Sequence, residues 1–167
     1  VDAISGPQVQ TLRLWRLAGE MGIARAVLIN RLDKENADFD AVMAALEESF
    51  GHRVGAVQIP MGSEADFTGV IDIIRMKSYH HEGDHEEVSE IPGSLKPAAE
   101  AAREKLTELV AEADDALMEK FLLDGERLTQ DELETLLEKA IYQGIFVPVF
   151  VASATELQGV ADLLDEI

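Results

Sequence analysis

The sequence has 167 residues, with 33 Asp and Glu residues against 14 Lys and Arg residues, which gives a formal net charge of −19 at pH 7. Such a charge argues against free-standing binding of nucleic acids, because phosphates would be repelled, and it favours a basic partner. The lack of cysteine excludes a disulfide framework, a thiolate zinc site and a cysteine nucleophile, and the lack of an apolar run of about 18 residues argues against a membrane span.

Both ends of the sequence are abrupt. Residues 1–4 are typical of the last part of a strand, and residues 163–167 stop inside an amphipathic run that has no cap. We therefore expect a piece of a longer protein, and a processed but complete chain is the alternative. No signal peptide is visible, so we expect a cytoplasmic location, which also agrees with the lack of cysteine.

The first part of the sequence alternates helices and strands. Apolar residues at helical spacing predict a helix between Pro7 and Gly22, and another over residues 40–50. Between them, residues 24–29 form a short run that is apolar on both faces, which is typical of a central parallel strand. This order predicts an α/β fold in which crossover helices cover a parallel sheet.

A different pattern follows. A strand is predicted over residues 54–59, one or two strands over residues 67–79, and a solvated hairpin or loop over residues 80–90. Two helices come next, one over residues 97–122 and one that opens at Thr129 with the spacing of a capping box. Strands followed by helices indicate an α+β unit.

The parallel-sheet pattern returns at the end of the sequence. Residues 147–151 are a second short apolar strand, and a last helix begins after Gly159. We therefore assign residues 1–54 and 145–167 to one α/β unit, and residues 55–144 to an α+β unit that is inserted into it.

Polar residues follow both apolar strands, at the edge where open α/β sheets bind their ligands. They are Asn30, Arg31 and Asp33 after one strand, and Ser153 and Ala154 after the other. A fixed carboxylate such as Asp33 can accept the N1–H and N2 amino groups of guanine together. Adenine would leave this carboxylate unpaired, at a cost of about 1–3 kcal/mol. A turn carboxylate in a surface loop is the alternative for Asp33.

The neighbouring residues suggest further contacts with a guanine base. Asn30 is placed to hold the loop and to reach the base N7, and the planar head of Arg31 is placed to lie on one face of the base. The backbone N–H groups at Ser153 and Ala154 are placed to donate to guanine O6. The spacing alone arises often by chance, and the two preceding strands strengthen it.

Motifs along nearly the whole sequence resemble bacterial elongation factor G. The matching segments are residues 1–11, 30–39, 62–67, 69–72, 75–79, 90–92, 111–115, 117–121, 148–150, 153–154 and 159–160. The matching segments between residues 62 and 121 are similar to the G′ subdomain, which elongation factor G carries inside its GTPase domain. The resemblance implies a P-loop-GTPase-like, three-layer α/β fold in which residues 55–144 are the inserted G′ subdomain.

Elongation factor G is a ribosome-dependent GTPase that drives translocation in protein synthesis. The resemblance implies that function for the complete parent protein, with GTP or GDP and Mg²⁺ as its ligands. The guanine-binding motif of the family is Asn-Lys-x-Asp, which Asn30 and Asp33 match while Arg31 replaces the lysine. The second base-binding motif, Gly-Ser-Ala, is Ala-Ser-Ala at residues 152–154. These departures leave room for a divergent paralogue.

The motifs that would hold the phosphates are absent. The sequence has no G-x-x-x-x-G-K-[ST] loop, no switch I and no true switch II. Residues 66–69 have the D-x-x-G spacing of switch II, but they follow the guanine-binding motif instead of preceding it. Because phosphoryl transfer depends on the missing motifs, we expect that this chain alone neither hydrolyses GTP nor binds it tightly, and we assign no catalytic residue.

Acidic residues line one side of the helix predicted over residues 97–122. They are Glu104, Glu108, Glu112, Asp115 and Glu119, which fall in one row at helical spacing. A solvated helix face is one explanation for the row. The G′ subdomain of elongation factor G is taken to meet the carboxyl-terminal domain of the ribosomal stalk protein. The resemblance therefore implies a partner-binding surface centred on Glu108, Glu112 and Asp115.

Two other functions agree with parts of the sequence. One is a non-enzymatic interaction module, or a degenerate paralogue, that docks a basic partner through the acidic helix and has lost nucleotide binding. The other is a metal site formed by His80, His81 and His85 with their acidic neighbours. An exposed, irregular loop gives no fixed ligand geometry, so we expect no metal there.

Overall fold

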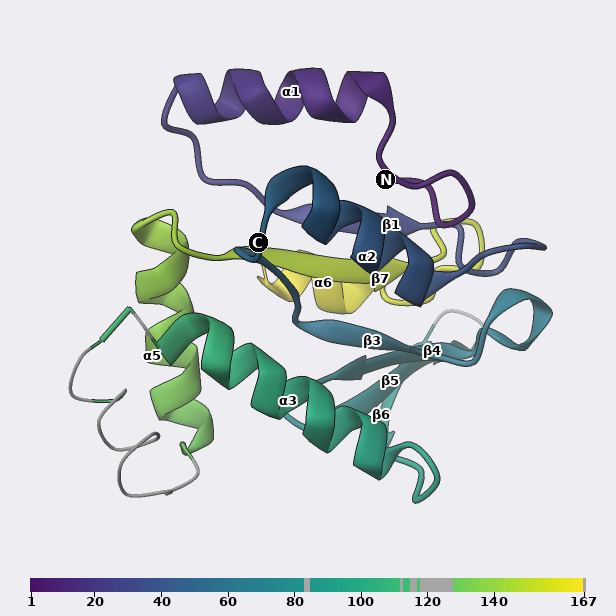
Figure 1. Cartoon of the computed structure of the whole chain (residues 1–167). Coiled ribbons are helices and arrows are strands. Elements are labelled where there is room, and N and C mark those ends of the chain that lie inside the picture. Colours follow the sequence, from purple (N-terminus) through teal and green to yellow (C-terminus); the bar gives the residue numbers. More distant parts are fainter. Residues whose placement is uncertain (83–84, 112, 115–116, 118–127, 167) are drawn as a thin grey trace.

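The computed structural model describes residues 1–82, 85–111, 113–114, 117 and 128–166 (Figure 1). These residues form one parallel and one antiparallel sheet, and helices pack against both. The α/β fold class expected from the sequence is therefore confirmed. No helix in this described part has the length and apolar character that crossing a bilayer requires.

The two sheets contain seven strands within the described residues. The parallel sheet consists, in spatial order, of β1 (Val27–Asn30), β7 (Val147–Ala152) and β2 (Val54–Ala56). The antiparallel sheet consists, in spatial order, of β3 (Gln58–Met61), β4 (Gly69–Asp72), β5 (Lys77–Glu82) and β6 (His85–Glu90).

Strand β7 is the centre of the parallel sheet. All six of its residues are buried, and it pairs with β1 on one side and with β2 on the other. Burial on both faces explains why this run is apolar without alternation. On the outer side of β1, the first residues of the chain continue the sheet. Asn30 donates its N–H to Val1 O and accepts from Ala3 N–H, both at 2.9 Å.

Helices lie on both sides of the parallel sheet. They are α1 (Val9–Glu20), α2 (Phe39–Phe50) and α6 (Val160–Glu166). In Figure 1, α1 and α2 lie on one side of the sheet and α6 on the other. Helix α2 begins where the Asp38 carboxylate accepts from Ala41 N–H at 2.9 Å, a typical amino-terminal cap. Its buried stripe consists of Val42, Leu46 and Phe50, at the spacing the sequence predicts.

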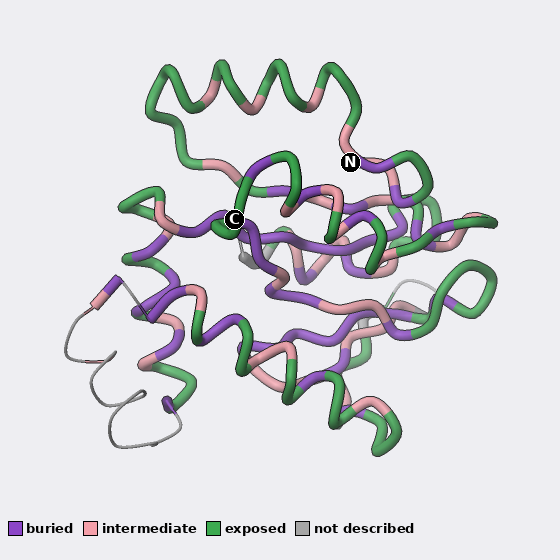
Figure 2. The backbone as a smooth tube through the Cα atoms, in the orientation of Figure 1, coloured by how far each residue is buried: buried purple, intermediate pink, exposed green. Residues whose placement is uncertain are grey.

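Two further helices share a core with the antiparallel sheet. They are α3 (Lys96–Ala111) and α5 (Gln130–Tyr142). The core includes Ile71 and Ile73 from the sheet side, Leu106 from α3, Leu136 from α5, and Phe150 from β7. All residues of β7 and β4 are buried, and Figure 2 shows the interior of the molecule in purple. Packing through Phe150 therefore joins the two sheets.

The capping box predicted at the start of α5 is confirmed. Thr129 Oγ1 accepts from Glu132 N–H at 3.3 Å, and Glu132 Oε2 accepts from Thr129 N–H at 2.8 Å. The helix then buries the leucine stripe that fixes its orientation, which is Leu133, Leu136 and Leu137.

The single strand predicted over residues 54–59 is two strands in different sheets. β2 pairs with β7 as far as Ala56, and β3 pairs with β4 in the antiparallel sheet. The chain passes between them at Val57, whose N–H donates to Val149 O at 3.0 Å. The apolar run did not reveal the change because both sheets bury apolar side chains. Pro60 lies within β3, an edge strand, where its missing N–H is tolerated.

The helix predicted over residues 97–122 is shorter than expected. Helix α3 ends at Ala111, and Ala113 lies in a turn that its N–H closes on Val110 O at 3.0 Å. Most of the remaining predicted helix lies outside the described residues. The segment 80–90, predicted as a hairpin or a loop, is the β5–β6 hairpin.

Candidate functional site

The loops that follow β1 and β7 emerge side by side. The register of the parallel sheet pairs Asn30 with Ala152, which are the last residues of the two strands. Residues 31–34 and residues 153–159 therefore start from one edge of the sheet. The structure brings the residues of the predicted guanine site to this edge, namely Asn30, Arg31, Asp33, Ser153 and Ala154.

Asn30 ties the two loops together. Its Oδ1 accepts from Ala154 N–H at 3.0 Å and from Arg31 N–H at 2.8 Å. The second bond accompanies a left-handed backbone at Arg31, whose φ is +75°, a conformation that is uncommon for residues other than glycine. A single amide oxygen therefore fixes the first residue of one loop against the other loop.

Asp33 is the carboxylate at the centre of the candidate site. Only 9% of its side chain is exposed. Its Oδ1 accepts from Ser153 Oγ at 2.6 Å, and its Oδ2 pairs with the Lys34 ammonium. Burial by itself would raise the pKa of this carboxyl, but hydrogen bonds from Lys34 and Ser153 outweigh burial and hold the pKa below its usual range. Asp33 is therefore ionised at neutral pH, and its remaining lone pairs can accept donors from a ligand.

The Arg31 side chain turns toward the start of the chain. Its Nη1 lies 2.5 Å from Asp2 Oδ2, and about half of the side chain is exposed. Asp2 Oδ1 in turn accepts from the N–H groups of Ile4, at 2.9 Å, and Ser5, at 3.1 Å. The bond from Ile4 is the main cause that holds the pKa of Asp2 below its usual range, and Ser5 and Arg31 add to it. The ion pair anchors Arg31 to the segment that precedes α1.

Ser153 and Ala154 lie in a tight loop whose N–H groups are already used. Ser153 is fully buried, and its N–H donates to Gln158 O at 3.0 Å. Ala154 is exposed, and its N–H donates to Asn30. A ligand oxygen would therefore have to share or replace the Ala154 bond. The structure shows a different role for Ser153, because its hydroxyl orients the Asp33 carboxylate.

Ala152 causes no backbone strain. It is the last residue of β7, is fully buried and pairs with Asn30. The described non-glycine residues with positive φ are Arg31, Asn36, Glu64, Met76 and Leu157, and Ala152 is not among them. An alanine is therefore accommodated at the position where the elongation factor G motif has glycine.

Three residues that the sequence did not single out contribute to this edge. Lys34 pairs with Asp33, Asp2 pairs with Arg31, and Gln158 closes the loop that carries Ser153. These contacts join residues that are adjacent in a loop or far apart in the sequence. No periodic spacing marks such contacts, so the sequence carries no pattern that predicts them.

The predicted partner-binding residues are only partly described. Glu108 lies on α3 and is exposed, and Glu104 lies exposed one turn earlier. Glu112 and Asp115 lie outside the described residues. The opposite side of α3 buries the side chains that face the antiparallel sheet, including Leu106 and Val110. The described part of the acidic row therefore faces solvent.

The loops at the ends of two parallel strands meet around an ionised, oriented carboxylate. This arrangement is typical of an α/β domain, and it places the candidate ligand site at the carboxyl edge of the strands. The whole chain, residues 1–167, matches the family model described as the elongation factor Tu GTP binding domain. The chain therefore belongs to this family of GTP-binding domains, which is the family of translational GTPases.

A solved structure is similar over the same length. It is a crystal structure of a protein from Thermus thermophilus, with a TM-score of 0.89 and 32% sequence identity. The match covers 100% of this chain and 25% of that chain. The present chain thus spans a quarter of the length of the Thermus protein that it matches.

Proposed function

We propose that this chain recognises the guanine base in a longer translational GTPase of the elongation factor G type, which acts with the ribosome in translocation. The observation that carries the proposal is the 2.6 Å hydrogen bond from Ser153 Oγ to Asp33 Oδ1. This bond joins the loops after two neighbouring strands and fixes an ionised carboxylate at the ligand edge. The elongation factor G motifs in both loops support the same proposal.

The donors and acceptors at this edge fit guanine. Asp33 accepts the N1–H and N2 amino groups together, while Ser153 keeps the carboxylate in place. The planar guanidinium of Arg31 covers one face of the base when its ion pair with Asp2 breaks or is shared with the ligand. GTP, with Mg²⁺, supplies the hydrolysable phosphate bond, and parts of the complete protein with the phosphate-binding motifs hold both. Residues 55–144 form the inserted G′ subdomain in this proposal.

A titration of fluorescent GDP and ADP into the full-length protein tests guanine recognition. The wild-type protein should bind GDP and reject ADP. The substitution Asp33→Asn should weaken GDP binding about 10- to 100-fold, because a charge-assisted pair of hydrogen bonds is lost. The same variant should gain affinity for xanthosine diphosphate, in which an oxygen replaces the N2 amino group, because the asparagine amide can donate to that oxygen.

A matched variant separates base recognition from a general change of charge. Glu35→Gln makes the same carboxylate-to-amide change at an exposed position of the same loop, and it should leave both affinities unchanged. An Asp33→Asn protein that keeps the wild-type preference for GDP over xanthosine diphosphate would overturn the proposal.

We further propose that the acidic face of α3 binds the carboxyl-terminal domain of the ribosomal stalk protein. Glu104 and Glu108 are its described, exposed members, and from the sequence that follows α3 the proposal adds Glu112 and Asp115, which lie outside the described residues. Changing Glu108, Glu112 and Asp115 to lysine should slow association about tenfold at low salt, with a smaller effect at high salt, because the contact steers a basic partner. Stopped-flow binding of the isolated stalk domain measures the rate.

The control for this prediction reverses the same number of charges elsewhere. Glu20, Glu35 and Glu48 are exposed and lie on α1, in a loop and on α2. Changing these three to lysine alters the net charge equally but leaves α3 intact. Equal slowing by both triple variants would show that overall charge, and not the α3 face, governs association.

One observation favours a second function, an interaction module that has lost nucleotide binding. The N–H groups of both Ser153 and Ala154 are bonded within the protein and would have to be released for a base. Failure of the full-length protein to bind GDP or ADP in the titration would support this function, and tight GDP binding would exclude it.

A further inference from the structure

The side chain of Gln158 joins the loop after β7 to the antiparallel sheet. Its Oε1 accepts from His81 N–H at 2.7 Å, and its Nε2 donates to His81 O at 2.9 Å. Strand β4 pairs only with residues 77–79 of β5, so it does not reach His81. The Gln158 amide therefore takes the place that a neighbouring strand would occupy at this residue.

The backbone of Gln158 is fixed as firmly as its side chain. Gln158 O accepts from Ser153 N–H at 3.0 Å, which closes the base of the loop. Gly159 follows with φ +72°, and a Cβ atom placed there would lie 2.5 Å from Val151 O. The loop thus sits directly against β7, and Gln158 cannot shift without moving Ser153.

A short chain of hydrogen bonds leads from the antiparallel sheet to the candidate guanine site. His81 bonds the Gln158 amide, Gln158 O bonds Ser153 N–H, and Ser153 Oγ bonds Asp33. Each link is short, and Ser153 is fully buried. Only two residues, Gln158 and Ser153, therefore lie between β5 and the Asp33 carboxylate in this chain of hydrogen bonds.

We propose that Gln158 is a positioning residue for guanine binding, through which β5 sets the geometry of the Ser153–Asp33 pair. The inference rests on the proposed function of the site. Gln158 touches no ligand in this arrangement and acts through Ser153. Loss of its amide frees the loop from β5, lets the Ser153 hydroxyl leave Asp33 and weakens GDP binding, even while the protein remains folded.

The test compares variants of Gln158 in the full-length protein. Gln158→Met keeps the length of the side chain and loses both hydrogen bonds, so the dissociation constant for fluorescent GDP should rise about tenfold. Gln158→Glu still accepts from His81 N–H but cannot donate to His81 O, so it should rescue part of the loss, to about threefold. Glu156→Gln, an exposed position of the same loop, should bind GDP as the wild type does.

The dissociation rate of GDP is measured at a temperature where circular dichroism shows every variant folded. Faster dissociation from Gln158→Met, with partial rescue by Gln158→Glu, supports positioning. Wild-type GDP binding by Gln158→Met, or equal weakening by Glu156→Gln, overturns it. If Gln158→Met does not fold, the Gln158→Glu value alone decides, because wild-type affinity there contradicts the inference.

The two proposals can fail separately. If Asp33→Asn binds GDP as the wild type does, the guanine site itself is wrong. If Asp33→Asn loses GDP binding while the Gln158 variants keep it, the guanine site stands and only the positioning role is lost.

Discussion

At the residue scale, the charge of Asp33 depends on two neighbours. The side chain is nearly buried, and burial works against ionisation. Lys34 and Ser153 reverse that tendency through hydrogen bonds to the two carboxylate oxygens. A carboxylate that stays charged and keeps a fixed orientation can accept two donors from one edge of a ligand, as the proposed guanine contact requires.

The lowered pKa of Asp33 predicts a dependence of stability on pH. Because the folded-state pKa lies below that of the unfolded chain, about 3.9, the stabilisation by Asp33 is fully present above that value. It is lost as the pH falls through the folded-state pKa. Thermal unfolding of wild type and Asp33→Asn should therefore differ at pH 6 and converge in strong acid. If the difference in unfolding temperature between the two proteins grows toward acid pH, the predicted pH dependence is wrong.

The sequence predicted several of the residues that meet at the strand-end edge but not their contacts. Asn30 and Asp33 could be found because a motif at a strand end has a fixed spacing, and the register of β1 and β7 brought Ser153 to them. The pairing of Arg31 with Asp2 could not be found. It depends on a left-handed backbone at Arg31, and an arginine gives no sign of that conformation in the sequence.

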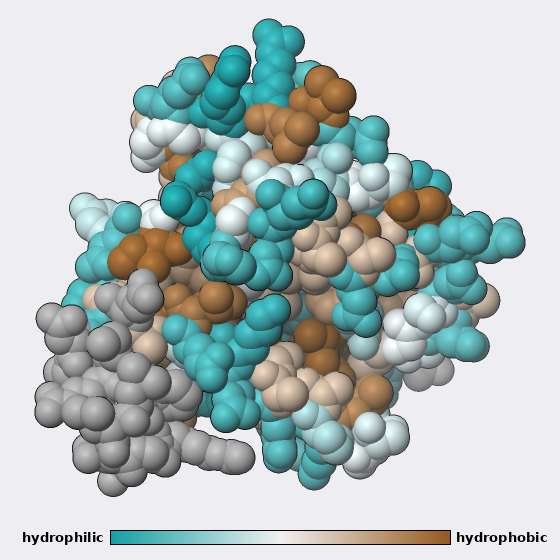
Figure 3. Space-filling view, viewed as in Figure 1, coloured by the Kyte–Doolittle hydropathy of each residue, from teal (hydrophilic) through white to brown (hydrophobic). Residues whose placement is uncertain are grey.

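At the element scale, α1 is the least buried helix of the parallel-sheet unit. None of its residues is fully buried, and Leu14 and Leu17 are each about half exposed. Figure 2 shows α1 exposed along its length, and Figure 3 shows apolar side chains on the surface over it. Trp15 provides its main contact, because its ring stacks on Phe50 of α2 with centroids 3.9 Å apart.

Removing this aromatic contact should loosen α1. The Arg25 guanidinium also lies over the Trp15 ring, at 4.2 Å from its centroid, so Trp15→Ala loses a stacked pair and a cation–π contact. We expect a loss of about 2 kcal/mol in the free energy of unfolding, measured by urea denaturation with circular dichroism. Leu17→Ala, on the exposed side of the same helix, should change it by less than about 0.5 kcal/mol.

Element types were predicted better than the points where elements end. Helices α2 and α5 were found because caps and buried stripes are local signals. The division of residues 54–59 between two sheets was missed, because the first part pairs with β7, which lies far along the chain, while the second part pairs with the nearby β4. A run of apolar residues does not indicate with which sheet it will pair.

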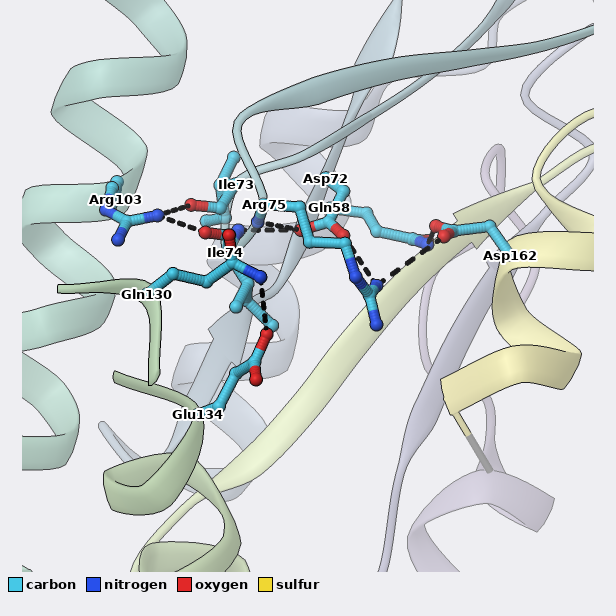
Figure 4. A network of polar contacts seen from close by, with 9 residues as sticks. All are labelled: Gln58, Asp72, Ile73, Ile74, Arg75, Arg103, Gln130, Glu134 and Asp162. Atoms are coloured by element: carbon cyan, nitrogen blue, oxygen red, sulfur yellow. Dashed lines mark hydrogen bonds and ion pairs between the residues drawn. The ribbon is translucent and has the colours of Figure 1, made fainter. Parts of the chain in front are cut away.

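At the scale of the whole molecule, buried polar side chains connect the two sheets (Figure 4). Gln58 of β3 accepts from Val151 N–H of β7 at 3.1 Å, and its amide nitrogen bonds the Asp162 carboxylate of α6. Arg75 bonds Asp72 at 2.8 Å and lies 4.0 Å from Asp162. This network places the antiparallel sheet against β7 and α6 in one arrangement.

Breaking the network should destabilise the whole chain. Gln58→Leu leaves Val151 N–H without its acceptor and removes one partner from the buried Asp162 carboxylate. We expect a loss of about 2–4 kcal/mol in the free energy of unfolding by urea. Gln10→Leu, a matched change at an exposed position of α1, should be nearly neutral. A cost below about 1 kcal/mol for Gln58→Leu would show that the two sheets are held mainly by apolar packing.

The pairing of Asp33 with Ser153 has a consequence for synthesis on the ribosome. The two residues are 120 positions apart, and all of the antiparallel sheet lies between them. At roughly 5–20 residues per second, the nascent chain carries Asp33 for about 6–24 s before Ser153 has been made. During that interval, the side of β1 that later pairs with β7 has not yet formed its strand pairing. The antiparallel sheet and α3 can already begin to bury their shared core. The order of translation thus lets the middle of the chain fold first, and the edge that carries Asp33 and Ser153 closes last.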